Sequence, residues 1–425
     1  MMVEKKRYKL NRLETTRLIG PLVDRHWAEL REAKERGEKV AWCSGPLFIF
    51  PYAMGMKCHF MAGYAAYCAG RKAGDQVLEA AEADGELMDT CSYHRLHTGM
   101  AAAILRGHPV KKEVILPIPD LLIIGRLCTE MAHYAEALHR RLGIPVVAVD
   151  FPPPRRKEDL PRLERFVVRQ IKENLIPTLE KVCGKEFDEE GLRRILRVLK
   201  EAATIRNQCW EFFKLKPTPW TLWDYGVSIA PVFYMMGKPE TVPYYKALLC
   251  ELKERAEKKI PAILPDGEKY RLYWDGWLPW AFLGMFIRKF VSYGAVPICG
   301  RYPWEFFPHP EYIDPDADDV VQNWVELYYT KAQQAAVFMP EGALEEVTKL
   351  VEEYSIDGLV MFASRTCRAW NVGQQEIINE VERRLGVPGV VIEADMVDSR
   401  MVSEAQIETR LQALFETIDA RRRRE

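Results

Sequence analysis

Two stretches far apart in the chain repeat one pattern of residues, and this repeat limits the possible folds more than any other feature. Residues 140–150 read RRLGIPVVAVD, and residues 383–395 read RRLGVPGVVIEAD. Each runs from the end of a helix through a glycine and a proline into a short apolar strand. Over 120–154 and 357–395 the full order is strand, loop, helix and strand. Continuous apolar strands joined in this way are typical of parallel sheets that are covered on both faces, so the repeat predicts an α/β fold.

The length of the chain predicts more than one domain. A chain of 425 residues is too long for one ordinary core. The sequence therefore predicts two doubly wound parallel-sheet domains with helical N-terminal and connecting segments. The expected divisions are residues 1–37 for the N-terminal helical segment, 38–155 for the first α/β domain, 156–265 for the helical connecting layer and 266–425 for the second α/β domain.

The charge balance excludes some classes of partner. The chain has 60 basic and 61 acidic residues, a net charge of −1, and nucleic-acid binding is driven by clustered positive charge. Residues 1–35 are charged throughout, without the apolar segment of a signal peptide. The longest apolar runs, such as LLIIG at 121–125, are far shorter than a membrane span. We therefore expect a cytoplasmic protein with neither nucleic acid nor membrane as a partner, in which the ten cysteines are mostly buried thiols.

One cysteine follows the first strand of each repeated unit. Cys128 and Cys367 both lie in the loop between strand and helix. In doubly wound sheets, ligands bind at the carboxyl ends of the strands. Both thiols are therefore expected where binding sites form.

A third cysteine, Cys91, lies in the stretch MDTCSYHRLHTG and allows four alternatives: a buried filler, a nucleophile, half of a disulfide or a metal ligand. A reducing compartment disfavours the disulfide, and no base is specified for a nucleophile. The chain has no CxxC pair, which argues against a zinc ribbon or a ferredoxin-type cluster. From the residues alone, a site that joins Cys91 to Cys128 and Cys367 is one alternative among others.

Several motifs, spread over nearly the whole chain, resemble the 2-hydroxyacyl-CoA dehydratase/benzoyl-CoA reductase family. No single motif is decisive, but their order and spacing together are specific. The motifs are NRLETTRLIGP at 11–21, WCSGP at 42–46, CSYHR at 91–95, LCTEMAHYAEAL at 127–138, RTCRAWNVGQ at 365–374 and EADMVDSRMVSEAQIETRLQAL at 393–414.

The resemblance implies two Rossmann-like domains with a [4Fe–4S] cluster between them. Carried over to this chain, the ligands are Cys91, Cys128 and Cys367, which leaves one iron open. It also implies an activator, a homodimeric iron–sulfur ATPase that delivers a low-potential electron. As a further partner it implies a homologous second subunit or a second copy of the chain, with which the chain forms a dimer. The electron converts the thioester carbonyl of an acyl-CoA into a ketyl radical. A dehydratase then eliminates water, whereas a reductase keeps the electrons. Ser44, in WCSGP, matches a serine that hydrogen-bonds the substrate hydroxyl or the ligand of the open iron.

The sequence departs from the dehydratases at one position. In those enzymes a glutamate some way after the WCSGP motif acts as acid or base, and here this position falls near Ala62. An alanine cannot move a proton. His59 either replaces the glutamate or is a structural residue. The departure favours the alternative of an ATP-dependent reductase of the same family.

Additional cysteines allow a second alternative for the cofactor. They are either buried thiols or further ligands of the kind found in double-cubane proteins, homodimeric relatives that carry an [8Fe–9S] cluster and reduce small molecules. The candidates are Cys43, Cys58, Cys68 and Cys299, whereas Cys183, Cys209 and Cys250 lie in helical stretches and are expected in the core.

Residues near the three cysteines have two interpretations. They either tune the potential of a cluster or form ordinary salt bridges, and the tryptophans between 274 and 280 either fill a seam or line a cleft. The residues beside the cysteines are Ser92, Tyr93, Arg95, Arg365 and Arg368, and we expect Asp395, Asp398 and Arg400 to be a structural end of the last strand.

Two other hypotheses remain open. In the first, the chain is a partner subunit without a functional cluster. In the second, it is an α/β binding or hydrolytic protein without a metal. The chain has no GxSxG, HExxH or GxxxxGK[ST] motif, and no GxGxxG that opens a helix, so hydrolysis and nucleotide binding are disfavoured.

Overall fold

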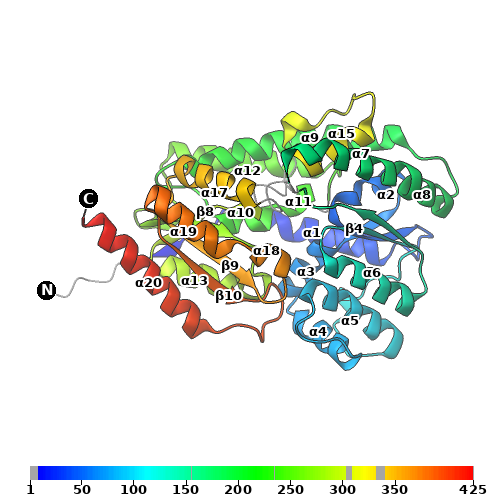
Figure 1. Cartoon of the computed structure of the whole chain (residues 1–425), viewed down its shortest axis with the longest axis horizontal. Helices are drawn as coiled ribbons and strands as arrows, with labels where there is room; N and C mark the ends of the chain where they lie inside the picture. The colour runs from blue at the N-terminus through cyan, green and yellow to red at the C-terminus, as the bar shows by residue number, and fades with distance from the viewer. Residues whose placement is uncertain (1–7, 155, 234, 303–308, 332–339, 425) are drawn as a thin grey trace.

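The structure, a computed structural model, describes residues 8–154, 156–233, 235–302, 309–331 and 340–424. Its two larger sheets each contain four parallel strands. Figure 1 shows the first sheet in the right half of the molecule and the second in the left half, with helices packed around both. The predicted α/β class with parallel sheets is confirmed, whereas the division into two Rossmann-like domains stays a prediction.

The first sheet has the strand order β3-β2-β4-β5. Its strands are short apolar runs, and β2 is buried along its whole length because helices cover both faces. In register, Cys43 of β2 lies opposite Ile123 of β4, and Trp42 lies opposite His59 of β3. The four strands are β2 (Val40–Ser44), β3 (Lys57–Phe60), β4 (Leu121–Arg126) and β5 (Val146–Asp150).

The second sheet has the order β10-β9-β7-β8. If the strands of each sheet are counted along the chain, both sheets have the spatial order 2-1-3-4. In this order the winding changes direction between the first and third strands, which is the switch point where ligands bind in such sheets. The strands are β7 (Tyr270–Asp275), β8 (Ala295–Cys299), β9 (Gly358–Ser364) and β10 (Gly389–Ala394).

The repeat in the sequence corresponds to the third strand, the following helix and the fourth strand of each sheet. These units are β4, α6 (Thr129–Leu142) and β5, and β9, α19 (Gln374–Leu385) and β10. Both helices end at a glycine with positive φ, 65° at Gly143 and 70° at Gly386. A left-handed residue at this place ends a helix, and glycine adopts it without a steric cost.

The remaining helices cover the sheets and connect them. Those between the strands of the first sheet are α2 (Ile49–Ala53), α3 (Met61–Gly70), α4 (Gly74–Ala83) and α5 (Ser92–Arg106). The connecting helices are α7 (Leu160–Gln170), α8 (Ile176–Cys183), α9 (Glu189–Trp210), α10 (Leu222–Ser228), α11 (Ala230–Phe233) and α12 (Thr241–Glu257). Those of the second half are α13 (Leu283–Ser292), α15 (Val320–Val325), α17 (Pro340–Glu353), α18 (Arg368–Asn371) and α20 (Glu404–Arg422).

The N-terminal segment packs against a distant part of the chain. Its helix α1 spans Thr16–Arg31, and the two-residue strand β1 (Lys9–Leu10) pairs antiparallel with β6 (Ile263–Leu264). The stretch 52–72 contains the strand β3 as well as α3 and is largely buried.

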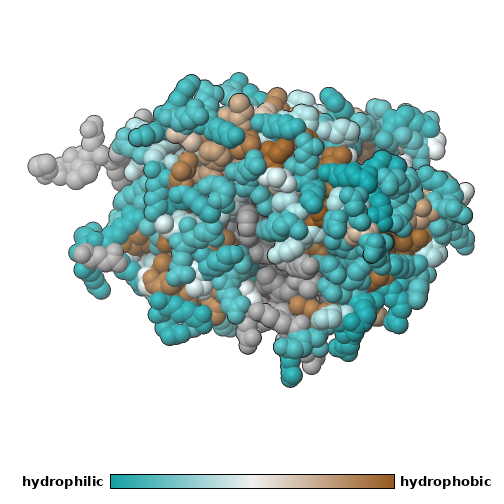
Figure 2. Space-filling model, turned by 90° about the horizontal axis from the view of Figure 1, so that it is seen from above, coloured by the Kyte–Doolittle hydropathy of each residue, from teal (hydrophilic) through white to brown (hydrophobic). Residues whose placement is uncertain are grey.

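Within the described ranges, no helix is both long and apolar enough to cross a bilayer. Figure 2 shows hydrophilic side chains over most of the face seen from above, with hydrophobic side chains in separate patches.

Candidate metal centre

The three predicted ligand cysteines share one local position. Each is the residue immediately before a helix: Cys91 before α5, Cys128 before α6 and Cys367 before α18. Cys128 and Cys367 follow the third strands of the two sheets, at their switch points. Burial raises the pKa of all three thiols, and backbone N–H groups that face each sulfur offset part of this rise: those of Tyr93 and His94 for Cys91, Glu130 and Met131 for Cys128, and Trp370 for Cys367.

The three thiols lie close enough for their charges to interact. Burial raises the pKa of Cys91 well above its usual value, and the neighbouring thiols of Cys367 and Cys128 raise it further. Burial is also the main reason why the pKa of Cys367 rises to about 11, with a contribution from Cys128. As residues, all three are partly exposed. Their role as ligands stays a prediction.

An aromatic wall contacts two of these segments. The indole Nε1 of Trp277 donates a hydrogen bond to Sγ of Cys367 at 3.3 Å. The Trp277 ring lies 4.7 Å from that of Tyr302 and 5.6 Å from that of Tyr93. The Tyr93 hydroxyl accepts a hydrogen bond from Nε1 of Trp280 at 2.8 Å. Trp277 therefore lies in the seam between the two cysteine segments, whereas Trp280 also lines a cavity. The sequence did not indicate the bond from Trp277 to a candidate ligand.

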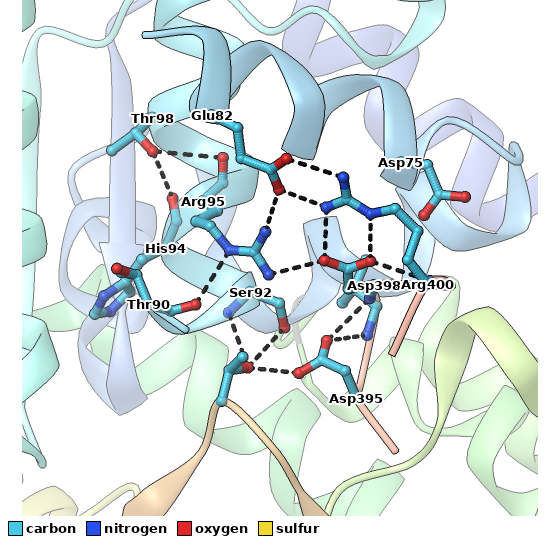
Figure 3. A network of polar contacts seen from close by, with 12 residues as sticks. Asp75, Glu82, Thr90, Ser92, His94, Arg95, Thr98, Asp395, Asp398 and Arg400 are labelled. Atoms are coloured by element: carbon cyan, nitrogen blue, oxygen red, sulfur yellow. Dashed lines mark hydrogen bonds and ion pairs between the residues drawn. The ribbon is translucent and has the colours of Figure 1, made fainter. Parts of the chain in front are cut away.

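A buried polar network ties the Cys91 segment to the Cys367 segment (Figure 3). The backbone N–H of Ser92 donates to Oγ1 of Thr366 at 3.1 Å, and Thr366 Oγ1 donates to Asp395 at 2.5 Å. The guanidinium of Arg95, on α5, pairs with Asp398 at 3.0 Å. It also pairs with Glu82 at 2.7 Å, and Arg400 contacts both of these carboxylates. Of the two interpretations of Arg95, the structure shows the interface salt bridge.

Ser44 lies at the carboxyl end of β2, beside the strand that leads to Cys128. Its side chain is 1% exposed. Its Oγ accepts a hydrogen bond from the backbone N–H of Gly125 at 3.1 Å. The first strand of the second sheet ends at the equivalent place with Asp275, which pairs with Arg301 in the interior. A catalytic role for Ser44 stays a prediction.

The surroundings of Ala62 contain little acid–base chemistry. Ala62 lines a cavity of about 430 Å³. Among the described residues that line it, the one carboxylate is Asp24, and it is paired with Arg71. His59 is fully buried, its Nε2 lies 2.5 Å from Nε2 of His97, and burial lowers its pKa well below the usual value. A neutral, buried imidazole favours the structural interpretation of His59.

The additional cysteines occupy interior positions. The thiols of Cys43 and Cys58, on neighbouring strands, lie near each other, and the Cys58 thiol donates to the carbonyl of Met56 at 3.9 Å. The thiol of Cys68 hydrogen-bonds Tyr64 within α3, and Cys299 ends β8. These four side chains are at most 2% exposed. The expectation that Cys250 lies in the core is wrong, because its position on α12 faces solvent and the residue is exposed.

The residues present fit an iron–sulfur cluster better than a single metal ion. In the part of the chain that the structure describes, no three His, Cys, Asp or Glu side chains converge on one point. A cluster does not need such convergence, because each thiolate binds a different iron. The thiols of Cys91, Cys128 and Cys367 are the right donors, and the N–H groups that face them suit an anionic group.

A large cavity opens beside Cys128. Its volume is about 1150 Å³, and it lies where the carboxyl ends of β4 and β5 meet α7. Apolar side chains such as Phe151 and Phe166 line it together with four arginines and one aspartate, Asp150, which is paired with Arg126. The arginines are Arg126, Arg162, Arg165 and Arg169.

Comparison with known proteins agrees with the resemblance in the sequence. Residues 49–418 match the family model described as 2-hydroxyglutaryl-CoA dehydratase, D-component. The chain is 28% identical to the (R)-phenyllactyl-CoA dehydratase alpha subunit of Clostridium sporogenes, over 93% of each chain. It is also 28% identical to a benzoyl-CoA reductase subunit of Thauera aromatica over 93% of each chain, and 27% identical to lactoyl-CoA dehydratase subunit alpha of Anaerotignum propionicum over 92% and 93%. Because the family model covers most of the chain, this protein belongs to the 2-hydroxyglutaryl-CoA dehydratase D-component family.

Proposed function

We propose that this chain is the cluster-bearing subunit of an enzyme that acts on an acyl-CoA, with a [4Fe–4S] cluster held by Cys91, Cys128 and Cys367. The observation that carries the proposal is the arrangement of three neighbouring cysteines, each partly exposed as a residue, each immediately before a helix and each with its sulfur facing backbone N–H donors. When bound, the cluster supplies the low-potential electron, received from a separate ATP-hydrolysing iron–sulfur activator, that converts a thioester carbonyl into a ketyl radical.

The cavity beside Cys128 is our candidate for the acyl-CoA. Its volume of about 1150 Å³ suits a large ligand, and Cys128 lies in its wall. Guanidinium groups bind phosphates through paired hydrogen bonds, so Arg165 and Arg169 would bind the phosphates of the coenzyme. The apolar side chains of Phe151 and Phe166 would contact its uncharged part.

Two reactions are compatible with this arrangement. A dehydratase, the activity named for most of the relatives above, eliminates water and needs a group that takes up the β-proton. Ser44 would hydrogen-bond the hydroxyl of such a substrate. The alternative is an ATP-dependent reductase, either benzoyl-CoA reductase-like or with a double-cubane [8Fe–9S] cluster. Ala62 favours this alternative, because its cavity offers only the paired Asp24 among the described carboxylates.

We also propose that the chain works as part of a dimer. The relatives above are each named as one subunit of an enzyme, and two of them as the alpha subunit. The partner here would be a homologous second subunit or a second copy of this chain.

The cluster is tested by anaerobic purification with iron and sulfide counted per chain. About four irons support the single cluster and about eight support the double cluster. Cys367→Ser should lose the broad brown absorbance, whereas Cys209→Ser, a buried position on α9, should keep it. A chain that holds no iron after careful reconstitution would refute both forms of the proposal.

The reaction is tested with activator, ATP and two probes. (R)-phenyllactyl-CoA should yield the dehydrated thioester if the chain is a dehydratase, and benzoyl-CoA should yield a ring-reduced product if it is a reductase. Arg165→Met should weaken binding of either probe, and Arg140→Met, an exposed arginine of α6 outside this cavity, is the matched control.

A further inference from the structure

We propose that Thr366 is a positioning residue that sets the separation between Cys91 and Cys367. The inference rests on the proposed role of these thiols as cluster ligands, and it assigns the residue that holds two of them in place. Thr366 immediately precedes Cys367, and its hydrogen-bond partner Ser92 immediately follows Cys91. This backbone hydrogen bond, together with a longer contact of 3.4 Å between the Thr366 and Ser92 hydroxyls, connects the neighbours of two thiols that lie far apart in the sequence.

The direction of the bonds follows from the donors available. A threonine hydroxyl has one hydrogen. The 2.5 Å contact with the Asp395 carboxylate takes this hydrogen, because a carboxylate can only accept. The Thr366 oxygen is then free to accept the backbone N–H of Ser92 at 3.1 Å. The Ser92 N–H belongs to the first turn of α5, where it has no acceptor within the helix.

The carboxylate behind Thr366 is itself fixed. Oδ1 of Asp395 accepts the backbone N–H groups of Val397 and Asp398, each at 2.9 Å. Asp398 in turn pairs with Arg95, one turn further along α5. The start of α5 is therefore attached to the second half of the molecule at two places, and the attachments share the segment 395–398 (Figure 3).

These contacts are buried, so water does not replace them. Ser92 is fully buried, Thr366 is 5% exposed and Asp395 is fully buried. Removal of the Thr366 hydroxyl leaves an N–H and a carboxylate oxygen short of a partner in the interior. Such a loss favours rearrangement of the contact, and any such movement changes the distance between the two thiols.

The first experiment measures that distance in the full chain without a cluster. Dibromobimane becomes strongly fluorescent only after both of its reactive groups have alkylated thiols, and peptide mapping identifies the Cys91–Cys367 cross-link. We expect the cross-linking rate to fall about tenfold in Thr366→Val. A lost buried hydrogen bond typically lowers the population of the bonded arrangement by about this factor. Thr366→Ser, which keeps the hydroxyl, should restore the cross-linking rate. Ser92→Ala keeps the backbone N–H and removes only the 3.4 Å hydroxyl contact, so it should change the rate far less than Thr366→Val does. Thr366→Ala is the second variant if Thr366→Val does not fold.

A control separates positioning from general stability. Thr348→Val removes a hydroxyl that bonds the carbonyl of Leu344 within α17, outside this network. Both valine variants should lower the melting temperature, but only Thr366→Val should change the cross-link.

The second experiment uses the reconstituted protein. In the presence of a chelator, Thr366→Val should lose iron about tenfold faster than the unchanged chain, because the bonded arrangement is less populated by the same factor. The variant should also alter the electron paramagnetic resonance spectrum of the reduced cluster.

The outcomes distinguish this inference from the proposed function. Equal cross-linking in the unchanged chain, Thr366→Val and Thr366→Ala would overturn the positioning role, as would failure of Thr366→Ser to restore it or absence of the cross-link from the unchanged chain. A chain that cross-links as expected but binds no iron would refute the proposed cluster and leave the positioning role intact.

Discussion

Arg95→Met tests whether the buried ion pairs of Figure 3 hold the two halves of the molecule together. The Arg95 side chain has no exposed surface, and its guanidinium contacts Asp398 at 3.0 Å and Glu82 at 2.7 Å. Its Nε also donates to the carbonyl of Thr90 at 3.1 Å. Methionine fills the volume of the arginine stem but replaces none of these bonds.

The expected loss in the free energy of unfolding depends on the contacts that remain after the substitution. The Asp398 side chain, also without exposed surface, keeps its contact with Arg400 at 2.8 Å. Removal of one partner from a buried ion pair costs about 3–5 kcal/mol, and the remaining arginine places Arg95→Met at the lower end, about 3 kcal/mol. In Asp398→Asn, Arg95 keeps the carboxylate of Glu82 and the carbonyl of Thr90, so a similar loss is expected.

Urea unfolding of the chain without a cluster measures the effect. Arg36→Met removes a contact with Glu38 at 2.7 Å in which the arginine side chain is 40% exposed, and it should lower the free energy of unfolding far less than Arg95→Met does, because solvent screens exposed ion pairs. A double-mutant cycle of Arg95→Met and Asp398→Asn should show a coupling energy of about 1 kcal/mol or more, because the two residues are in contact. A loss for Arg95→Met equal to that of Arg36→Met would refute the reasoning.

Three further predictions concern the interior. Burial lowers the pKa of His97 to about 3. The unfolded chain protonates this histidine below about pH 6.5 and the folded chain does not, so the free energy of unfolding falls as the pH decreases from 6.5 towards 3, by about 2 kcal/mol at pH 5. A melting temperature that is equal at pH 7 and pH 5 would contradict this. Asp275→Asn leaves Arg301 as a buried charge without its carboxylate and should cost about 3–5 kcal/mol in urea unfolding, whereas no measurable loss would show that the pair is dispensable. Ser44→Ala should reduce turnover of a 2-hydroxyacyl-CoA at least about tenfold, as for a lost hydrogen bond to substrate, without loss of iron per chain, and unchanged turnover would exclude the proposed contact.

The repeated α/β units were predictable because their signals are local. Apolar strands, a helical period and a terminal glycine at Gly143 and at Gly386 lie within each unit, and the structure ends both helices there. The pairing of β1 with β6 was not predictable, because two-residue strands such as Lys9–Leu10 carry no period and their partner is far away in the sequence. The strand β3 was missed because its neighbours are rich in small residues that are typical of tightly packed helices.

The candidate site was predictable only in part for the same reason. The position of Cys128 and of Cys367 between strand and helix follows from local pattern. The bond from Trp277 to Cys367 spans 90 residues, and the bond from Ser92 to Thr366 spans 274. No local pattern specifies such contacts, because they depend on how the two halves are packed. One signal was available and unused: side chains alternate along a strand, so Cys43 and Ser44 had to face opposite sides of the first sheet.

The equal strand order of the two sheets gives the molecule an internal symmetry that the candidate centre breaks. Each half supplies one thiol after its third strand, Cys128 in one and Cys367 in the other. The third thiol, Cys91, comes from the segment between the second and third strands of the first sheet, and the corresponding segment of the second half, residues 300–357, contains no cysteine. A four-iron cluster held here would therefore have three ligands from the chain. One position would be left for a substrate, because the first half supplies two of the thiols and the second half supplies one.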